Sequence, residues 1–555
     1  MMIKSLFSIV KGVLIIIPFI INNNVCAQNK GTFSGGLESN FNYFVRDTLI
    51  GANDIPQYDH LLYGAESWLD LKYKYGTWEF GVRFDMFNNS NLKDPKSTYS
   101  DQGIGNWYVK KKIKKLEITG GHFYDQIGAG TIFRAYEERA LFVENSIYGI
   151  RLKYDINDNW TAKIFTGRQK YLFGTYPAVI RGANIEGFFT IGKDNPVSIA
   201  PGIGFINRTH DDKTISKLVN IVKNYLPEDQ TAPVYNTCLG TVYSNISYNS
   251  WSLYFESSYK SPEMFKNPFL DKLELTGDTT KGKYVKEAGS VIYTSLGYAK
   301  NKLGVTAEFK RTENFDFRTD PTLLVNHGLI NFIPPMNRLN TYTLTARYSP
   351  ATQLLSEKAY QLDIKYAFSR KLTFNVNFSN ISNLDDNLLY REIFTEILYK
   401  KGRKWRLVTG LQYQNYNQPV YEKEGTEMLI AYTPYLDFLF KLSRKKSINI
   451  EAQYMHTKQD FGSWLNVFLE FSSAPHWSFE ASGMYNIKPS EKAPKDKNNK
   501  LLSILYPSLG LTYTNGPNRY SLRYVKQVEG VVCSGGVCRL EPAFSGIKMN
   551  ITSRF

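Results

Sequence analysis

Apolar and polar residues alternate along most of this chain, and the pattern is clearest in its last nine residues. Successive side chains of a strand point to opposite sides, so these residues predict a strand with one apolar and one polar face. The apolar face carries Ile547, Met549, Ile551 and Phe555, with Ser553 as its one weak position. The polar face carries Lys548, Asn550, Thr552 and Arg554. This pattern is typical of a barrel strand between lipid and a wet lumen; the alternative is an edge strand of a soluble sheet.

The same alternation, interrupted by short turns, predicts a hairpin over residues 65–86. The apolar face of its first strand consists of Ala65, Ser67, Leu69, Leu71, Tyr73 and Tyr75. The polar face consists of Glu66, Asp70, Lys72 and Lys74, with Trp68 among them. After the turn at Gly76-Thr77, the second strand points Trp78, Phe80, Val82, Phe84 and Met86 outward, and Glu79, Arg83 and Asp85 inward.

Short turns mark one end of such a barrel and longer connections the other, so strand direction can be followed along the chain. The first strand, 32–44, runs outward. Short turns fall near Gly76, Lys114, Asn157, Lys193, Asn249, Lys300, Arg370, Gly402, Lys445, Pro475 and Gly516. In the first half, longer connections fall near 45–63, 88–102, 124–145, 169–182, 208–233 and 260–288.

Read directly, the pattern gives an odd number of strands, about 25. The strand at 303–312 would then clash in direction with the one at 360–368. A further strand at 322–332, followed by a periplasmic turn at residues 333–336, removes the clash and makes 350–357 an extracellular loop. The prediction is an all-β fold, a single large antiparallel transmembrane β-barrel of about 26 strands (roughly 24–26) over residues 28–555.

The composition agrees with a barrel. The chain has 39 Tyr, 35 Phe and 8 Trp, yet its mean hydropathy is only −0.34. A barrel shows lipid only half of its strand residues, and aromatic residues form girdles at both interfaces. Beyond the N-terminal region, no stretch approaches the roughly 20 apolar residues that a spanning helix needs.

The N-terminal residues 1–27 predict a cleaved signal peptide. Lys4 and Lys11 precede an apolar run at 12–21, and Val25-Cys26-Ala27 offers a small-residue cleavage site. Cys26 could suggest a lipoprotein, but the residues before it lack the small-residue box that lipidation requires. Export together with a barrel predicts the bacterial outer membrane, with its lipids and the barrel assembly machinery as partners. The terminal aromatic Phe555, with Ile551, resembles the C-terminal signal that this machinery recognises.

The formal net charge is +16, or +14 without Lys4 and Lys11. An exported barrel makes nucleic acid an unsuitable partner for this charge. Much of the charge falls in the short turns, at residues 110–115, 300–302, 370–371, 400–404 and 444–446. One interpretation is a basic ring facing anionic lipid headgroups at the inner leaflet. The other is simple solvation of the turns.

Three cysteines remain after cleavage, and an exported protein can form disulfides. Cys533 and Cys538 can close a small loop across Gly535-Gly536, between the last two strands and therefore on the extracellular side. Cys238 is then left unpaired on a strand. No His lies in that loop, so no metal site is predicted there, and the chain implies no cofactor.

The third long connection carries the candidate functional residues. It mixes glycines with charged side chains, namely Asp125, Arg134, Glu137, Glu138 and Arg139. General porins fold the loop at this position into the lumen, where opposed charges would narrow the pore and set a transverse field. The alternative is a salt-bridged structural loop without a transport role. Gly128-Ala129-Gly130 does not predict a nucleotide site, because no βαβ unit surrounds it.

Two segments carry a family resemblance. Residues 121–139, with Phe-Tyr-Asp-Gln and Arg-Ala-Tyr-Glu-Glu-Arg, and residues 533–539, Cys-Ser-Gly-Gly-Val-Cys-Arg, resemble a Bacteroidota outer-membrane barrel family of unknown function, DUF6029. The resemblance spans the mature chain and implies a porin-like barrel without an assigned substrate. Some barrels of this kind are similar to accessory subunits of large outer-membrane machines. That similarity implies other outer-membrane proteins or surface lipoproteins as partners.

No catalytic residue is predicted, so an enzyme is not expected. The six histidines are scattered singly, and none lies in a Gly-x-Ser-x-Gly or H-E-x-x-H motif. Active import is not expected either, because the first strand starts within a few residues of Gln28 and leaves no room for an N-terminal plug.

Two functions remain. The first is a porin-like passive channel for small solutes, with loops folded into a lumen lined by Lys72, Arg83, Arg134 and Arg139. The second is a non-conducting accessory or scaffold barrel of a larger complex for assembly, secretion or uptake. Porins of about 16–18 strands already leave a channel, so a larger lumen must be filled. The connections at 208–233, 260–288 and 487–502 are the expected filling.

Overall fold

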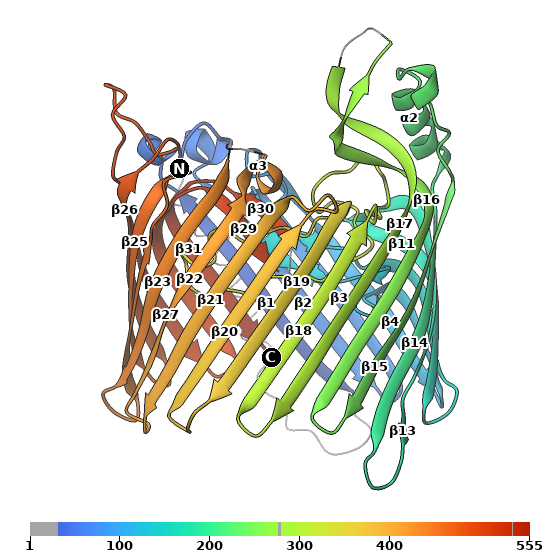
Figure 1. Ribbon diagram of the computed structural model, residues 1–555, viewed down its shortest axis with the longest axis horizontal. Helices are drawn as coiled ribbons and strands as arrows, with labels where there is room; N and C mark the ends of the chain where they lie inside the picture. Colours follow the sequence, from blue (N-terminus) through green and yellow to red (C-terminus); the bar gives the residue numbers. More distant parts are fainter. Residues whose placement is uncertain (1–30, 276–278, 424, 426, 535–536) are drawn as a thin grey trace.

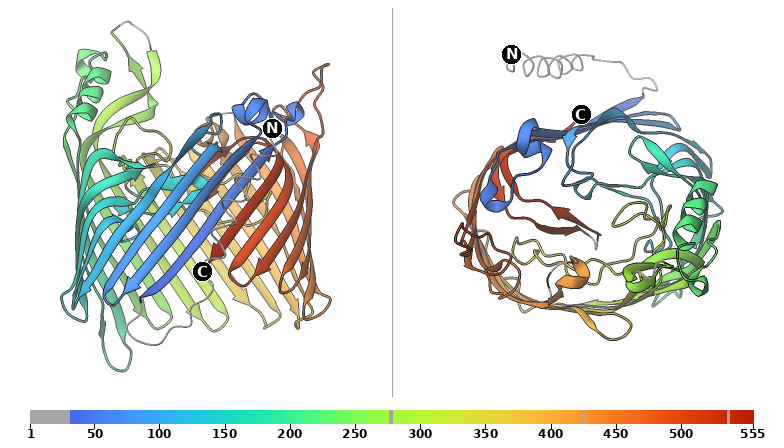
Figure 2. Two further views of the ribbon diagram at one scale, coloured as in Figure 1. Left: turned by 180° about the vertical axis from the view of Figure 1, so that it is seen from behind. Right: turned by 90° about the horizontal axis from the view of Figure 1, so that it is seen from above.

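The computed structural model of the chain describes residues 31–275, 279–423, 425, 427–534 and 537–555, without the side chains of 532–538. The predicted signal peptide, residues 1–27, lies outside the described residues. Within these residues, twenty-four antiparallel strands close into one barrel (Figures 1 and 2), and this number is the lower end of the predicted range of 24–26. One further strand, β13 (Phe189–Ile191), extends the hairpin between β12 and β14.

The barrel strands follow one another around the wall in chain order. The first half comprises β1 (Thr32–Phe44), β2 (Tyr63–Tyr75), β3 (Trp78–Ser90), β4 (Tyr99–Ile113), β5 (Leu116–Phe123), β10 (Ile147–Asp155), β11 (Trp160–Tyr171), β12 (Gly174–Gly187), β14 (Val197–Thr209), β15 (Asn236–Tyr248), β16 (Trp251–Leu273) and β17 (Thr279–Lys300). The second half comprises β18 (Leu303–Glu313), β19 (Ser356–Ala367), β20 (Leu372–Ser382), β21 (Leu388–Lys401), β22 (Trp405–Asn417), β23 (Met428–Lys441), β24 (Lys446–Met455), β25 (Gly462–Ser473), β26 (Trp477–Pro489), β27 (Leu505–Asn515), β28 (Asn518–Gln527) and β31 (Phe544–Arg554).

The connections contain the remaining elements. Short strands are β6 (Gln126–Ile127), β7 (Phe133–Arg134), β8 (Glu137–Glu138), β9 (Val143–Glu144), β29 (Gly530–Ser534) and β30 (Val537–Glu541). Helices and helical turns are η2 (Thr48–Ile50), η3 (Gln57–Leu61), η4 (Arg139–Leu141), α2 (Asp212–Val222), η5 (Pro227–Asp229) and α3 (Gln418–Tyr421). None of these helices in the described part of the chain is long and apolar enough to cross a membrane.

The ends of the chain close the barrel. The final strand β31 pairs with β28 on one side and with β1 on the other, where Phe41 lies opposite Met549. Phe555 exchanges two backbone hydrogen bonds with Gly35, of 2.7 and 3.0 Å, and its ring stacks on Phe33. Phe555 and Ile551, predicted as an assembly signal, therefore lie at the seam of the barrel.

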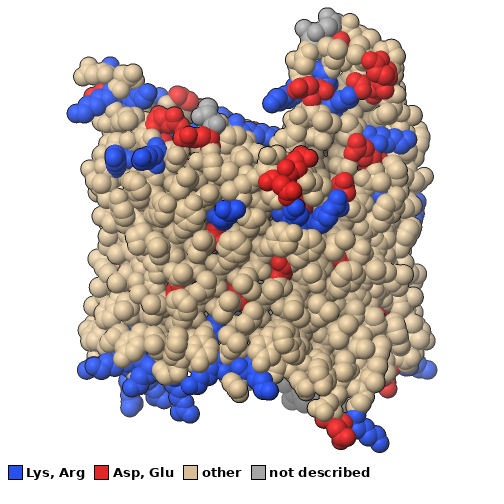
Figure 3. All heavy atoms as spheres, in the orientation of Figure 1, with Lys and Arg blue, Asp and Glu red and all other residues tan. Residues whose placement is uncertain are grey.

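The alternation of side chains separates the two faces of the wall as predicted. Tyr73, Phe80 and Phe84 are exposed on the outer face, whereas Arg83 and Asp85 are buried inside. All eleven predicted short turns fall between paired strands at one end of the barrel. Figure 3 shows Lys and Arg side chains along this rim on the viewed face, below a broad band that carries few charges.

The predicted strand at 322–332 is wrong. β18 and β19 are direct antiparallel neighbours, with Glu313 opposite Ser356, so there is no clash of direction to repair. Residues 314–355 instead form one long connection that crosses the lumen (Figure 2). Its apolar residues satisfy the strand pattern but bury against other luminal side chains, and Pro334-Pro335 cannot donate to a ladder.

Residues 208–233 and 260–288, which were expected to fill the lumen, lie elsewhere. The β16–β17 hairpin and α2 rise beyond the wall at the long-loop end (Figure 1), where Leu218 and Tyr225 pack against Met264 and Tyr284. The lumen is occupied instead by residues 124–146, by residues 314–355 and by the hairpin of β29 and β30 (Figure 2).

Two apolar clusters join these segments to the inner wall. In the first, Ile132 and Phe133 of the third connection meet Phe315, Phe317 and Ile330. The second cluster gathers around Leu344, Tyr348 and Trp464, with Phe44 and Tyr58 packed beside them. Inward positions of a barrel wall are expected to be polar, so these clusters mark where the luminal segments are anchored.

Candidate functional site

The segment of residues 124–146, hereafter the constriction segment, lies inside the barrel. A buried carboxylate on strand β16 holds it to the wall. Glu256 of β16 is fully buried and accepts hydrogen bonds from the backbone N–H of Ala129, at 2.7 Å, and from the hydroxyl of Thr131. Gly128, at φ +56°, makes this approach possible, because a Cβ there would lie 2.7 Å from Glu256 Oε1. The backbone can therefore meet the wall only with glycine at this position.

A second luminal segment, residues 314–355, pairs with the constriction segment. The N–H of Arg134 donates to the carbonyl of Ile330, and the N–H of Phe332 donates to the carbonyl of Gly130, both at 2.9 Å. The Arg134 guanidinium lies 4.1 Å from the centroid of the Phe332 ring and 4.6 Å from that of Tyr136. Arg134 thus joins the two segments through cation–π contacts.

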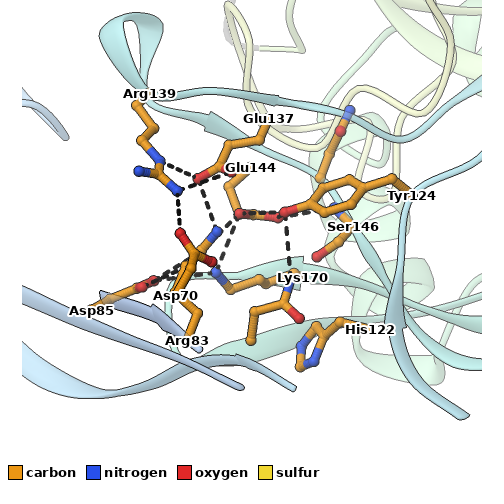
Figure 4. Close-up of polar contacts among 12 residues, drawn as sticks. Asp70, Arg83, Asp85, His122, Tyr124, Glu137, Arg139, Glu144, Ser146 and Lys170 are labelled. Carbon is orange, nitrogen blue, oxygen red and sulfur yellow. Dashed lines mark hydrogen bonds and ion pairs between the residues drawn. The ribbon is translucent and has the colours of Figure 1, made fainter. Parts of the chain in front are cut away.

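Ion pairs cross from the constriction segment to the wall of β1–β3 and β11. We call the set around Arg83 the Arg83 cluster (Figure 4). Its cations are Arg83, Arg139 and Lys170, and its carboxylates are Glu38, Asp70, Asp85, Glu137 and Glu144.

Arg83 lies at the centre of this cluster. Its guanidinium binds Asp85 on its own strand at 2.6 and 2.9 Å. It also donates to Glu137 and Glu144 of the constriction segment, each at 2.9 Å. Only the planar fork of arginine can hold three carboxylates in this way, since its donors point in fixed directions.

Arg139 extends the cluster to the next wall strands. It donates to Glu38 of β1 at 2.7 Å, to Asp70 of β2 at 3.1 Å and to Glu137 at 2.8 Å. Its guanidinium also lies 5.0 Å from the ring of Trp68, the apolar residue that the alternation places on the inner face. The inward Trp68 therefore supports Arg139.

A second set of ion pairs, the Asp125 cluster, lies at the start of the constriction segment. Its members are Arg151, Lys163, Glu117, Asp125 and Glu186. Asp125 accepts from Arg151 and Lys163, each at 3.1 Å. Tyr124 links the two clusters, because its hydroxyl donates to Glu144 while its carbonyl accepts from Arg151.

The Arg83 cluster separates two cavities. The larger, of about 820 Å³, is lined by residues near the short-turn ends of β2–β4, including Lys72, Glu79 and Tyr108. The smaller, of about 70 Å³, lies toward the long-loop end and is lined by Phe87, Tyr171 and His327. Arg83, Glu137 and Arg139 line both cavities, so this layer of charge is the boundary between them.

The two glutamates of the constriction segment have opposite pKa shifts. Burial, together with the negative charge of Glu144, raises the pKa of Glu137. Burial acts in the same direction on Glu144, but Lys170 and Arg83 outweigh it and lower the pKa of Glu144. Glu144 therefore keeps its charge, and Glu137 is the member of the pair that takes up a proton first as the pH falls.

The five predicted candidate residues have different environments in the structure. Asp125, Glu137 and Arg139 belong to the charged clusters, Arg134 stacks on aromatic rings, and Glu138 is in none of the ion pairs of the described residues. Sequence reasoning did not connect this segment with wall residues such as Glu38, Asp70 and Lys170. Alternation alone predicts that Asp70 points inward. Its partner Arg139 could not be predicted, because it depends on where the constriction segment lies in the lumen.

The hairpin of β29 and β30 also enters the lumen. Its backbone places Cys533 directly opposite Cys538, and Arg539 donates to the carbonyl of Ala140 at 3.2 Å. The predicted disulfide involves side chains outside the described residues and stays a prediction. Cys238 is a free thiol on β15, close to the amide of Asn207. The described residues hold no group of His, Cys, Asp and Glu side chains suited to a metal ion.

Three solved outer-membrane barrels illustrate the likeness of this chain to known folds. The translocation pore of the P pilus usher PapC matches with a TM-score of 0.43 and 8% identity, over 94% of this chain and 99% of that chain. OccAB4 of Acinetobacter baumannii matches with a TM-score of 0.32 and 11% identity, over 72% and 96%. The ferric-catecholate import receptor Fiu of E. coli K12 matches with a TM-score of 0.38 and 10% identity, over 95% and 82%.

No curated protein matches the chain. A family model, described as a family of unknown function, DUF6029, matches residues 3–555. The chain, a large antiparallel β-barrel of the outer-membrane type, therefore belongs to the DUF6029 family.

Proposed function

We propose that this protein is a passive channel for small hydrophilic solutes in the outer membrane of a Bacteroidota bacterium. It reaches that membrane through its signal peptide, residues 1–27, and the barrel assembly machinery, and it has no catalytic activity. The resemblance of its motifs and the apolar outer face of the wall support this location.

One observation carries the proposal: the same three side chains line a cavity on each side of the constriction segment. The larger cavity runs along the short-turn half of β2–β4, and the smaller lies beyond the charged layer. A solute that crosses the lumen here passes Arg83, Glu137 and Arg139. A charged constriction in the lumen can limit the size and charge of the solutes that a pore passes.

The first test is conductance of the purified barrel in a planar bilayer, combined with a thiol block at a neighbouring pair of residues. Asp70 lines the larger cavity, and Leu69 belongs to the outward series of the same strand. In Asp70→Cys, a charged methanethiosulfonate reagent should reduce the conductance. In the matched control Leu69→Cys, the same reagent should leave it unchanged, and the native cysteines are common to both proteins.

Stable conductance steps with block at position 70 alone support the channel. Absence of conductance from correctly folded protein overturns it. If the reagent changes the conductance of neither variant, the ion path lies elsewhere in the lumen, and this constriction does not limit it.

A second function, an accessory barrel of a larger complex, is favoured by the height of the β16–β17 hairpin. Together with α2 it rises beyond the wall (Figure 1), and Phe269 and Leu270 are exposed on it. Such a projection offers contacts to another outer-membrane protein or a surface lipoprotein. A silent barrel that is recovered in a stable complex, and that loses its partner when the hairpin is shortened, would support this function instead.

A further inference from the structure

We propose that the constriction prefers cations, so that the channel passes small cationic solutes more readily than anions of the same size. This inference rests on the proposed channel function. It runs against the formal net charge of the chain, +16, which would suggest an anion channel if the charge were spread evenly.

The first observation is the balance of charge at the constriction. The Arg83 cluster has three cations and five carboxylates, and the Asp125 cluster has two cations and three carboxylates. Together, eight carboxylates face five cations, which leaves three negative charges. If Glu137 carries a proton, two negative charges remain.

The second observation is which members of the clusters meet the lumen. The side chains of Arg83 and Lys170 are 4% and 3% exposed, because they lie behind the constriction segment and against the wall. Glu38, Asp70 and Glu186 are 38%, 39% and 42% exposed. The cations Arg139, Arg151 and Lys163 are 20%, 15% and 12% exposed, so the most exposed members of the two clusters are carboxylates.

The basic residues that set the net charge lie away from this layer. Many belong to the short turns at the rim. Lys72 and Arg554 are exposed in the larger cavity; Lys72 lies between Asp70 and the turn at Gly76, and Arg554 is the last residue of β31. Charge acts most strongly on an ion where low-dielectric walls are close together, so the constriction outweighs the wider basic mouth.

The experiment measures the reversal potential of single channels across a potassium chloride gradient. Wild-type protein is expected to prefer potassium. The double variant Glu38→Gln/Asp70→Asn removes the two exposed carboxylates beside Arg139 and should lower the potassium-to-chloride permeability ratio by roughly tenfold, the lower end of the effect of charged clefts on local ion concentration.

Two further variants separate charge from structure. Glu186→Gln removes an exposed carboxylate of the Asp125 cluster without touching the Arg83 cluster and should shift the ratio in the same direction. Glu79→Gln is the matched control: Glu79 lines the wider cavity and pairs with Lys110, at 3.6 Å, so its loss should shift the ratio much less.

The outcomes distinguish the two proposals. A conducting channel that prefers chloride, or whose reversal potential is unchanged in both the double variant and Glu186→Gln, overturns the cation preference and leaves the channel function standing. A shift as large in Glu79→Gln as in the double variant also overturns it, because the selectivity would then arise in the vestibule. Absence of conductance overturns the channel function and this inference together.

Discussion

Arg83 shows how a single inward side chain holds a luminal segment in place. It is buried among three carboxylates, two of which come from the constriction segment. Removing one member of such a buried set costs about 3–5 kcal/mol, mostly because the remaining charges lose their partners. These ion pairs therefore fix the position of the constriction segment as much as they set the charge of the lumen.

Gly128 is the residue whose replacement should loosen the constriction segment. Alanine at this position would combine a positive φ with a Cβ 2.7 Å from Glu256, and the strain should cost about 1–3 kcal/mol. We expect Gly128→Ala to increase hydrogen exchange in residues 124–146. Gly120→Ala is the control, since a Cβ there meets nothing within 4 Å. Equal exchange in the two variants would contradict the anchoring by Glu256.

His210 predicts a pH dependence at the base of the projecting α2. Burial, and then the charge of Arg208, lower the pKa of His210 to about 4. The unfolded side chain binds a proton near pH 6.5, so stability is complete above that pH and is lost as the pH falls toward 4. The loss is on the order of 3 kcal/mol.

We expect the hydrogen-exchange protection factors of residues 211–222 to fall between about pH 6.5 and 4. His210→Gln, which cannot titrate, should remove this dependence. A wild-type protein whose protection factors stay constant over the window would show that His210 is not buried in its neutral form.

At the scale of elements, the long connections divide into those that enter the lumen and those that rise beyond the wall. Residues 322–332 and α2 both carry closely spaced apolar residues. The first segment meets the constriction segment inside the barrel, whereas α2 packs on the β16–β17 hairpin outside the lumen. Local pattern does not distinguish these destinations, because both bury an apolar face.

The luminal connection between β18 and β19 can be removed without breaking the wall. Glu313 and Ser356 are paired neighbours, so a short Asn-Gly turn can replace residues 315–354. We expect this deletion to raise single-channel conductance several-fold, because the segment no longer fills the lumen.

The matched control is the same turn in place of residues 211–234, which include α2. Thr209 and Asn236 are likewise paired neighbours, but this connection lies beyond the wall. Its removal should leave conductance unchanged. A deletion of 315–354 without effect on conductance would mean that this segment does not limit the path.

The predicted disulfide lies in the hairpin of β29 and β30. If Cys533 and Cys538 form a disulfide, a membrane-impermeant thiol reagent added to intact cells should label them only after reduction. A Cys533→Ser/Cys538→Ser variant should show only the background of Cys238. Labelling of the unreduced wild type above that background would contradict the bond.

At the scale of the whole molecule, the two ends of the barrel differ in loop length and charge. The short turns lie at one rim together with many Lys and Arg side chains (Figure 3), and the projecting elements lie at the other. Proteins of this architecture place short turns in the periplasm.

Epitope tags test this orientation. A tag between Gly402 and Arg403 should be inaccessible to antibody on intact cells and accessible after the outer membrane is opened. A tag between Lys223 and Asn224, in the connection that follows α2, should be accessible on intact cells. The reverse result would invert the barrel and place the luminal segments at the periplasmic end.

The sequence by itself determined the wall of this protein: the strand faces, the short turns and the closure by the final strand. These features depend on alternation of neighbouring side chains and on turns of a few residues, which are local. The tertiary structure alone decided which connections fill the lumen and which charges meet there. Gly130 and Phe332, or Glu38 and Arg139, are distant in the chain, and their contacts form only once the wall has closed around them.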